Sequence, residues 1–375
     1  MQRPSLRLLL GLLFVPRFTA AHQLRLLVLS DVHDSLAGVK RAHQWLVNQG
    51  RSVDFVLCPG DFTTMDTKRH GEAEYVLRHE QLMQSLLREM EAIADVVWVP
   101  GNHDPLSAFG EAKPQREGFM GRSCHGEAVK LAADLFAAGL GGSVEARQKG
   151  DVVWEHFPLP DSGLKPHVDK LVAETASLGP KSLILMTHNG PTGVSTTEVR
   201  GVDPNSLYTS GVPQDTITSG SSSVEAAISG EQWQKQLLFN VHGHTHHGLG
   251  RAQLGSVPVL NPGSVRYSAA FMLVSLGYVA EGGGDSGGDS GSGGGGGGSW
   301  RLISTEFIEL GDDADSHSHS HSHADSQSHR QDEELRRVAR AGVALPSMHS
   351  FAAVAGMLAA ALLTVGALTA AVRLP

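Results

Sequence analysis

Apolar runs alternate with amphipathic segments over the first hundred residues. Three runs are almost wholly apolar and predict short buried strands: Leu24–Leu29, Val53–Cys58 and Val96–Val99. Between these runs, residues 36–48 and 71–93 carry apolar side chains at helical spacing. The order strand, helix, strand, helix, strand is typical of an α/β fold with parallel central strands.

The pattern is less regular in the second part of the chain. Helices are predicted over Lys130–Ala138, around Lys165–Leu178 and near Ser229–Gln236. Further apolar runs predict strands over Val152–Glu155, Ser182–Met186, Leu237–Val241 and Val257–Leu260. Residues 139–143 are rich in glycine, which indicates tight packing against another segment, and residues 192–224 predict a long mobile loop.

A composition change near residue 281 does not mark a domain boundary. Residues 281–299 are almost entirely Gly, Ser and Asp, which is typical of a flexible linker. The strands predicted over Phe271–Tyr278 and Trp300–Leu310 flank this run, and the second needs a partner in a sheet. We therefore expect a β-hairpin with an insertion at its tip, within one domain over residues 23–311.

Both ends of the chain carry apolar segments. Residues 1–22 surround an apolar centre with arginines, contain no acidic residue and end in small side chains, which fits a signal peptide or a transit peptide. Residues 351–372 are apolar and long enough to span a bilayer, so they predict a transmembrane or anchor segment. The His/Ser-rich residues 312–350 predict a disordered linker, whose alternating histidines form either a solvated spacer or a weak zinc or nickel site.

The two ends predict different topologies. Arg336, Arg337 and Arg340 precede the apolar segment and Arg373 follows it, which places the amino side in the cytoplasm, as in a tail anchor. A cleaved signal peptide would place the same body in the secretory pathway, and a glycolipid anchor would reconcile the two ends. We expect a membrane-associated protein of the secretory pathway or an organelle, with a cytosol-facing tail-anchored protein as the alternative.

Composition excludes some classes of partner and structure. The 375 residues carry a formal net charge of −9 without a basic stripe, so no nucleic-acid partner is expected. Cys58 and Cys124 are the only cysteines, so the chain has no disulfide framework.

Metal-type side chains follow five of the predicted strands. They are Asp31, His33, Asp61, Asn102, His188, His244 and His246. Each one alone is more simply explained as a turn former or a hydrogen-bonded loop residue. Together, carboxylate, amide and imidazole groups at successive strand ends are the ligand set that a pair of metal ions needs, and this mixture suits manganese, iron or zinc.

The motifs that carry these side chains stand in a recognisable order. They are Asp31-x-His33, Gly60-Asp61, Gly101-Asn102-His103-Asp104, Thr187-His188 and Gly243-His244-x-His246. In this order they resemble the calcineurin-like metallophosphoesterase superfamily, over about residues 24 to 310. The resemblance implies an α/β fold built as a four-layer α/β/β/α sandwich around a site for two divalent or trivalent metal ions.

The resemblance also implies a role for each site residue. One metal ion would take Asp31, His33 and His246, the other would take Asn102, His188 and His244, and Asp61 would bridge them. His103 would protonate the leaving oxygen, and Asp104 would orient His103. Asp34 is a weaker candidate for supporting His33.

The expected chemistry is hydrolysis of phosphate esters. Two metal ions about 4 Å apart clamp the phosphoryl group and hold a bridging hydroxide that attacks phosphorus in line. Asn189 and Arg266 are further candidates for contacting the substrate phosphate. No arginine stands beside Asp61 or before Gly101, which disfavours the phosphoprotein phosphatase branch. Monoesters and diesters both remain open as substrates, and the alternative function is a protein-interaction scaffold of this fold without turnover.

Overall fold

The computed structural model describes residues 23–110, 119–148, 150–199, 217–280 and 298–310. The predicted leader, the linker over 312–350 and the apolar segment over 351–372 lie outside these ranges, as do residues 200–216 and 281–297. The described residues belong to one compact unit, residues 1–312. Within the described ranges, none of the helices has both the length and the apolar character needed to cross a membrane.

The first sheet has six strands in the order β16-β15-β1-β2-β3-β4. Strands β1, β2, β3 and β4 are parallel, whereas β15 runs antiparallel to β1 and β16 antiparallel to β15. The strands are β1 (Gln23–Val28), β2 (Phe55–Cys58), β3 (Asp95–Trp98), β4 (Arg122–Ser123), β15 (Ala270–Ala280) and β16 (Gly298–Glu309). The three parallel strands predicted first are therefore confirmed.

The second sheet also has six strands, in the order β13-β14-β12-β9-β6-β5. Its four central strands are parallel and its two edge strands are antiparallel to their neighbours. The strands are β5 (Ala128–Ala132), β6 (Leu135–Leu140), β9 (Leu183–Thr187), β12 (Leu237–His242), β13 (Gly250–Leu254) and β14 (Val257–Asn261).

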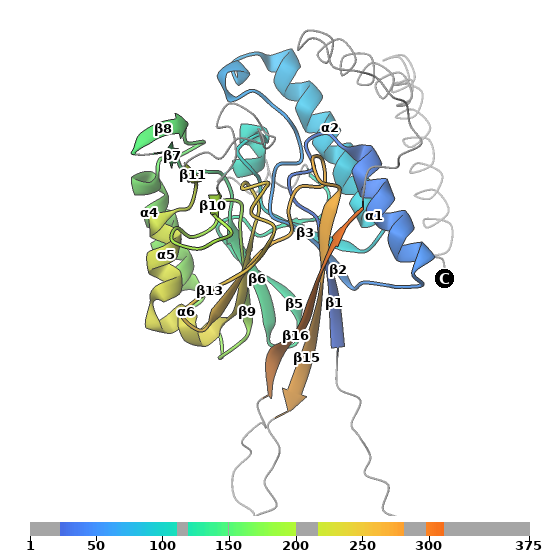
Figure 1. Ribbon diagram of the computed structural model, residues 1–375, viewed down its shortest axis with the longest axis vertical. Coiled ribbons are helices and arrows are strands. Elements are labelled where there is room, and N and C mark those ends of the chain that lie inside the picture. Colours follow the sequence, from blue (N-terminus) through green and yellow to red (C-terminus); the bar gives the residue numbers. More distant parts are fainter. Residues whose placement is uncertain (1–22, 111–118, 149, 200–216, 281–297, 311–375) are drawn as a thin grey trace, which may run out of the picture. The chain divides into compact units, whose positions relative to one another are not determined.

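Helices cover the outer face of each sheet, so the fold has four layers (Figure 1). Helices α1 (Leu36–Asn48) and α2 (Ala73–Glu91) lie along the first sheet, and α4 (Asp161–Glu174), α5 (Ser222–Ser229) and α6 (Glu231–Gln236) lie along the second. The main core lies between the sheets, where Val28 and Leu57 pack in one cluster with Ile184 and Met186. A second core, with Leu171 and Trp233, joins the second sheet to its helices. The predicted α/β/β/α sandwich is confirmed.

Short elements lie in the loops at one end of the two sheets. A small third sheet has the order β10-β11-β7-β8. Its strands are β7 (Ala146–Gln148), β8 (Asp151–Trp154), β10 (Glu198–Val199) and β11 (Ile217–Thr218). Two single 3₁₀ turns, η1 (Thr67–Arg69) and η2 (Leu106–Phe109), follow the loops after β2 and β3.

The helix predicted over Lys130–Ala138 is wrong, because this segment forms strands β5 and β6. The two strands pair antiparallel around a turn in which Asp134 has a φ of 55°. Strand β6 is buried on both faces, where Leu135 and Ala137 face the main core and Ala138 and Leu140 face the helices. A strand that is buried on both faces has a continuous run of apolar residues. The periodicity of such a run does not distinguish a buried strand from a buried helix.

The predicted hairpin is formed by the two strands at the edge of the first sheet. Strands β15 and β16 pair antiparallel from Ala270 opposite Glu309 to Ala280 opposite Gly298, with one register shift after Ser275. Strand β16 pairs with β15 and forms the edge of the sheet. The alternation of apolar and polar residues over 300–310 agrees with this position, because successive side chains of a strand point to opposite faces of the sheet.

Candidate functional site

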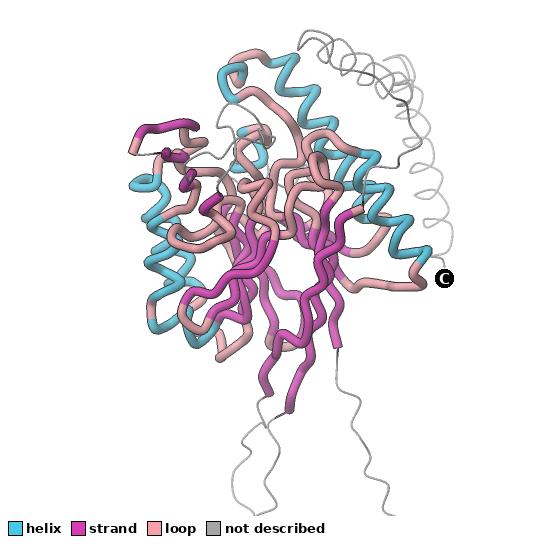
Figure 2. The backbone as a smooth tube through the Cα atoms, viewed as in Figure 1, coloured by secondary structure: helices cyan, strands magenta, loops and turns pink. Residues whose placement is uncertain are grey.

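All of the predicted metal ligands lie beyond the carboxyl ends of parallel strands. Asp31 and His33 follow β1, Asp61 follows β2, Asn102 follows β3, His188 follows β9, and His244 and His246 follow β12. Figure 2 shows that the loops gather at this end of both sheets. Parallel strands direct their carboxyl ends to one edge, so ligands from distant parts of the chain meet there.

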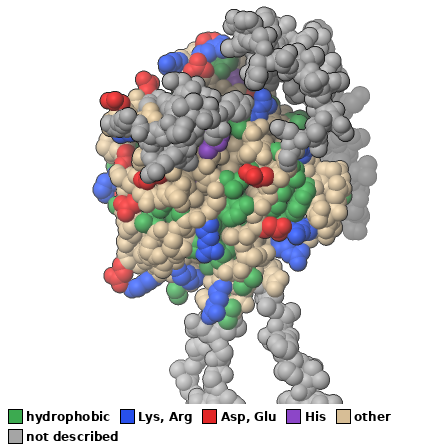
Figure 3. Space-filling view, in the orientation of Figure 1, with side chains coloured by type: hydrophobic (Ala, Val, Ile, Leu, Met, Phe, Trp, Pro, Cys, Tyr) green, Lys and Arg blue, Asp and Glu red, His purple; other side chains and the backbone are tan. Residues whose placement is uncertain are grey.

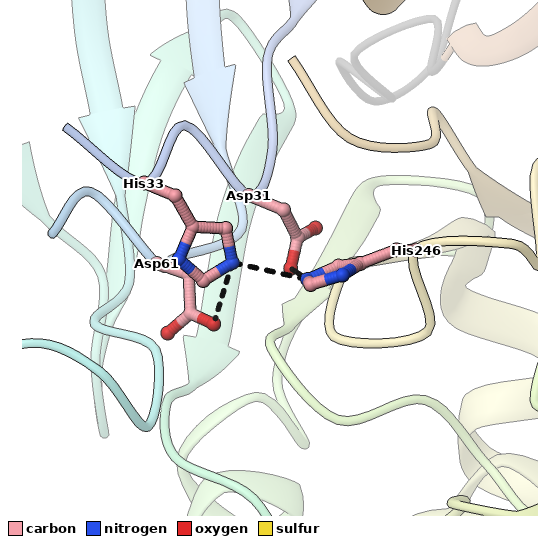
Figure 4. Close-up of side chains that lie close together, drawn as sticks. All are labelled: Asp31, His33, Asp61 and His246. Atoms are coloured by element: carbon pink, nitrogen blue, oxygen red, sulfur yellow. Dashed lines mark hydrogen bonds and ion pairs between the residues drawn. The ribbon is translucent and has the colours of Figure 1, made fainter. Parts of the chain in front are cut away.

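Four of these side chains form the first ligand group, which is drawn in Figure 4. Asp31, His33, Asp61 and His246 each direct one ligand atom into a cluster in which all of these atoms lie within 4.8 Å of one another. His33 Nε2 lies 3.0 Å from His246 Nε2 and 3.5 Å from Asp61 Oδ2. His246 Nε2 also lies 3.2 Å from Asp31 Oδ1.

The second ligand group lies on the other side of Asp61. Asp61, His188 and His244 form a cluster with ligand atoms within 4.8 Å of one another. His188 Nε2 lies 3.3 Å from Asp61 Oδ2 and 2.9 Å from Asn102 Oδ1, which adds the amide oxygen to this group. The Asp61 carboxylate is therefore common to both groups.

The loops that carry the ligands are joined by hydrogen bonds. His33 N donates to Asp61 O at 3.0 Å, and His103 N donates to Asp61 Oδ1 at 2.8 Å. His244 N donates to Asp31 Oδ1 at 2.9 Å, which connects the two sheets. These bonds fix the separation of the ligand groups before any ion binds.

Four of the ligands have a strained backbone. The φ angles are 50° for Asp31, 44° for His33, 54° for Asp61 and 63° for His244. Left-handed φ values cost of order 1–3 kcal/mol for residues other than glycine, and they persist where the surrounding structure holds them in place. Strain of this kind is concentrated at functional sites.

Two glycines in the motifs allow these loops to approach one another. A side chain on Gly101 would place its Cβ 2.1 Å from Asp61 Oδ1, and one on Gly243 would place it 2.1 Å from Ser30 Oγ. Neither position has room for a methyl group, so the glycines of the motifs are explained by close packing around the carboxylates.

The buried carboxylates are held in their charged form. Burial alone would raise the pKa of Asp31, but the hydrogen bond and charge of His246 outweigh it and lower the pKa to about 2. Burial likewise opposes the charge of Asp61, whereas the charges of His188 and His103 hold its pKa well below the usual range. Both carboxylates are therefore negatively charged at neutral pH, as a ligand for a cation must be.

The imidazoles of the site fall into two electrostatic classes. Burial lowers the pKa of His33 and of His244 to about 3 each, so both are neutral near pH 7 and carry a lone pair for a metal ion. Burial acts in the same direction on His188, but the charge of Asp61 and its hydrogen bond outweigh it and raise the pKa to about 9. In the absence of a metal ion, His188 is therefore cationic near pH 7.

The site fits a pair of metal ions in two further respects. His188 Nδ1 donates to Pro59 O at 2.8 Å, which fixes the ring so that Nε2 faces Asp61 and Asn102. His244 Nε2 is buried and has no hydrogen-bond partner. A buried nitrogen without a partner is costly unless a ligand binds it, and a metal ion is such a ligand.

The residue predicted as proton donor is held by a backbone carbonyl. His103 is half-buried, its Nδ1 donates to Met65 O at 3.1 Å, and its ring centroid lies 5.3 Å from that of His33. This bond fixes the ring beside the first ligand group. His103 therefore lies beside the group formed by Asp31, His33, Asp61 and His246.

The expected contact between Asp104 and the His103 ring is corrected by the structure. The two carboxylate oxygens of Asp104 accept hydrogen bonds from Thr63 N at 2.9 Å and Gly101 N at 2.7 Å. Asp104 is fully buried, and burial together with the charge of Asp61 raises its pKa to about 7. Asp104 therefore positions the loops that carry Asp61 and Asn102, while Met65 O orients His103.

The weaker candidates also have other roles. Both oxygens of Asp34 bind Thr64, through its backbone N at 3.0 Å and its hydroxyl group, so Asp34 supports that loop rather than the His33 ring. Asn189 is buried, accepts from Val144 N at 2.6 Å and donates to Ser219 O, which occupies its amide with backbone groups. Arg266 is exposed and its backbone N donates to Asp31 O at 3.2 Å, which leaves its side chain unassigned, so its contact with the substrate phosphate stays a prediction.

Two aromatic residues beside the ligands had no signal in the sequence. The Tyr267 ring lies 4.9 Å from that of His246 and 5.4 Å from that of His33. The Trp154 ring lies 6.3 Å from that of His244. Each aromatic residue stands alone in an ordinary stretch, so only the fold brings one to each ligand group.

A sequence family and several solved structures are similar to this chain. A sequence model described as calcineurin-like phosphoesterase matches residues 24–248. Among solved structures, the protein TT1561 of Thermus thermophilus is 15% identical with a TM-score of 0.44, covering 68% of this chain and 94% of that chain. YfcE, a phosphoesterase from E. coli, is 16% identical with a TM-score of 0.26, covering 66% of this chain and 87% of that chain.

A third solved structure, a novel archaeal phosphodiesterase, is 14% identical with a TM-score of 0.28, covering 67% of this chain and 92% of that chain. No curated protein matches this chain. The family model spans more than half of the chain and includes all five ligand motifs, so the chain belongs to the calcineurin-like phosphoesterase family.

Proposed function

We propose that this protein is a two-metal hydrolase of phosphate esters. The observation that supports the proposal most directly is the shared carboxylate of Asp61, whose Oδ2 lies 3.5 Å from His33 Nε2 and 3.3 Å from His188 Nε2. One carboxylate between two groups of ligands is the arrangement that a pair of neighbouring metal ions requires.

The ligand assignment follows from the two groups. Asp31, His33 and His246 would hold one ion, and Asn102, His188 and His244 would hold the other, with Asp61 between them. Bound ions would supply an activated hydroxide near neutral pH and would neutralise charge on the phosphate oxygens. Oxygen and imidazole ligands together suit manganese, iron or zinc.

His103 is proposed as the proton donor to the leaving oxygen. Because Met65 O accepts from Nδ1, the ring is fixed and Nε2 is the nitrogen that exchanges a proton with the substrate. In the donating form both ring nitrogens carry a proton, and Nε2 gives its proton to the oxygen as the ester bond breaks. His103 also lies against His33, beside the proposed first ion.

A small phosphate ester suits the surface better than a nucleic acid. On the face drawn in Figure 3, Lys and Arg side chains are interspersed with Asp and Glu side chains. Proteins that follow a nucleic-acid backbone use a continuous run of positive charge. The proposed substrate is therefore a phosphomonoester or a small phosphodiester.

The test uses the full chain, stripped of metal with a chelator and then supplied with Mn²⁺. Hydrolysis of p-nitrophenyl phosphate, phenyl phosphate and bis(p-nitrophenyl) phosphate is compared for the wild type, His103→Ala and His43→Ala. His43 lies on α1 away from the ligand groups, so its variant is the matched control. The preferred ester identifies monoester or diester specificity.

We expect turnover that depends on Mn²⁺, and a loss of about a hundredfold or more in His103→Ala with unchanged metal content. The loss should be larger for phenyl phosphate, whose leaving group is less acidic than p-nitrophenol. An equal loss for both leaving groups would argue against proton donation. A folded, metal-loaded chain without turnover on any ester would favour the scaffold function instead.

A further inference from the structure

A cavity of about 600 Å³ lies beside the loops of the metal centre. It is bounded by η2, by the glycine-rich residues 141–143 after β6, and by α4. We name it the η2–α4 cavity. Its volume is within the range of pockets that hold small molecules.

The η2–α4 cavity is separate from the metal ligands but shares a wall with their loops. None of the seven ligands is among the described residues that line it. Gly142 N donates to Pro100 O at 3.0 Å, directly before the Gly101-Asn102 motif. On the other side of that motif, η2 begins two residues after Asp104.

Most of the cavity wall is apolar. The apolar lining residues are Leu106, Phe109, Leu140, Phe157, Leu159 and Leu164. Phe109 and Phe157 meet edge to face with ring centroids 5.8 Å apart, which gives the wall an aromatic corner. Such a wall favours a ligand with a flat apolar body.

Among the described residues that line the cavity, Lys170 of α4 carries a positive charge and none carries a carboxylate. The lining also includes His125, whose Nδ1 accepts a hydrogen bond from Gly141 N at 2.8 Å. Lys170 Nζ lies 3.7 Å from Glu174, but both side chains are exposed, and exposed pairs of this kind interact weakly. The Lys170 ammonium group is therefore available to a bound anion.

We propose that the η2–α4 cavity binds a small amphipathic anion. Its apolar body packs against Phe109 and Phe157, and its negative group lies near Lys170. The binding does not depend on the proposed catalytic activity, so the two can fail independently. This chemistry fits either the organic part of a substrate or a separate ligand.

The test titrates 2-naphthalenesulfonate into the metal-free full chain by calorimetry, with 2-naphthol as the matched neutral probe. We expect saturable one-to-one binding of the sulfonate and binding of naphthol that is weaker by about fivefold or more. Equal affinities for the two probes would overturn the anionic part of the proposal.

Two variants with matched controls locate the bound probe. Leu106 is 47% exposed at the cavity, so Leu106→Trp should fill it and abolish binding, whereas Leu77→Trp, at an exposed position on α2, should not. Lys170→Glu should weaken binding about tenfold, and Lys165→Glu, on the same helix but outside the lining, by less than about twofold. If Leu106→Trp and Lys170→Glu bind the sulfonate as tightly as their control variants do, the assignment of the bound probe to the η2–α4 cavity is overturned.

A final measurement distinguishes the two sources of the ligand. With Mn²⁺ and p-nitrophenyl phosphate, an increase in KM alone on adding the sulfonate would assign the cavity to the substrate. A change in kcat would assign it to a separate ligand that acts through the Pro100–Asp104 loop.

Discussion

The two ligand groups that share Asp61 differ in charge. The first group adds a second carboxylate, Asp31, whose pKa is about 2, and a neutral imidazole, His33. The second adds no further carboxylate: it has the uncharged amide of Asn102, the neutral imidazole of His244, and His188, whose pKa of about 9 makes it a cation near pH 7. Similar motifs at neighbouring strand ends thus give electrostatically unlike sites.

The difference indicates an order of metal binding. A cation that enters the first group meets two carboxylates and a neutral nitrogen, whereas one that enters the second must displace a proton from His188. In the metal-free protein the protonated His188 balances the charge of Asp61 from the second side. We therefore expect the first group to bind an ion more tightly than the second.

The largest effect is expected from Asp61→Asn, which removes the charge common to both groups. The variant should bind at most one ion per chain and lose activity by about a thousandfold or more, because both ions depend on this carboxylate. Metal content by mass spectrometry and the rate with p-nitrophenyl phosphate provide the measurements. Asp66→Asn is the control, since Asp66 is an exposed carboxylate that caps η1.

Two ions per chain with full activity in Asp61→Asn would contradict the shared carboxylate. The comparison between the groups would then lose its basis, since each group would hold an ion without Asp61.

The next effect compares one imidazole from each group. His188→Ala leaves the second group with a single carboxylate and should reduce metal content to about one ion, while His33→Ala leaves two carboxylates and should retain more metal. Both rates should fall by at least about a hundredfold, because each ligand supports one side of the site. Equal metal loss in the two variants would contradict the expectation that the first group binds an ion more tightly than the second.

A smaller effect is expected from pH. The pKa of His188 in the metal-free chain is raised to about 9, so the ring is protonated below that pH and must lose a proton when an ion binds. Affinity of the second group should rise about tenfold per pH unit between pH 6 and 8. Asp31 and His33 of the first group have already lost their protons in this range, so neither adds a comparable pH dependence.

Calorimetric titration of Mn²⁺ at several pH values, in buffers of different ionisation enthalpy, measures both affinities and the protons released. About one proton should accompany the weaker binding event. Two affinities that rise in parallel with pH would remove the electrostatic distinction between the groups.

The smallest effect is expected from Asp104→Asn. The amide retains one acceptor oxygen, so either Gly101 N or Thr63 N loses its partner, and the free energy of unfolding should fall by about 1–3 kcal/mol. Because Gly101 precedes Asn102, metal affinity should weaken more in the second group than in the first. Asp54→Asn, at an exposed carboxylate that also accepts a backbone N–H, should cost less in chemical denaturation. An equal cost would contradict the role of Asp104 as a buried loop support.

Secondary structure could be predicted from the sequence where the pattern of apolar and polar residues within one segment indicates a strand or a helix. The strands before Asp31, Asp61 and Asn102, the amphipathic helices α1 and α2, and the β15–β16 hairpin were all predicted from spacing alone. The candidate ligands could be named for the same reason, since each stands directly after a strand and parallel strands bring their carboxyl ends to one edge.

Other features depended on contacts between distant segments. Residues 130–138 form strands β5 and β6 because burial on both faces, and not periodicity, decides their structure. Asp104 binds Thr63 and Gly101 instead of orienting His103, because the loop after β2 lies against the loop after β3. The sequence by itself determined which side chains stand at the strand ends. Only the tertiary structure decided which of them share a neighbour, and therefore which imidazole is charged, because pKa values depend on burial and on charges brought together by folding.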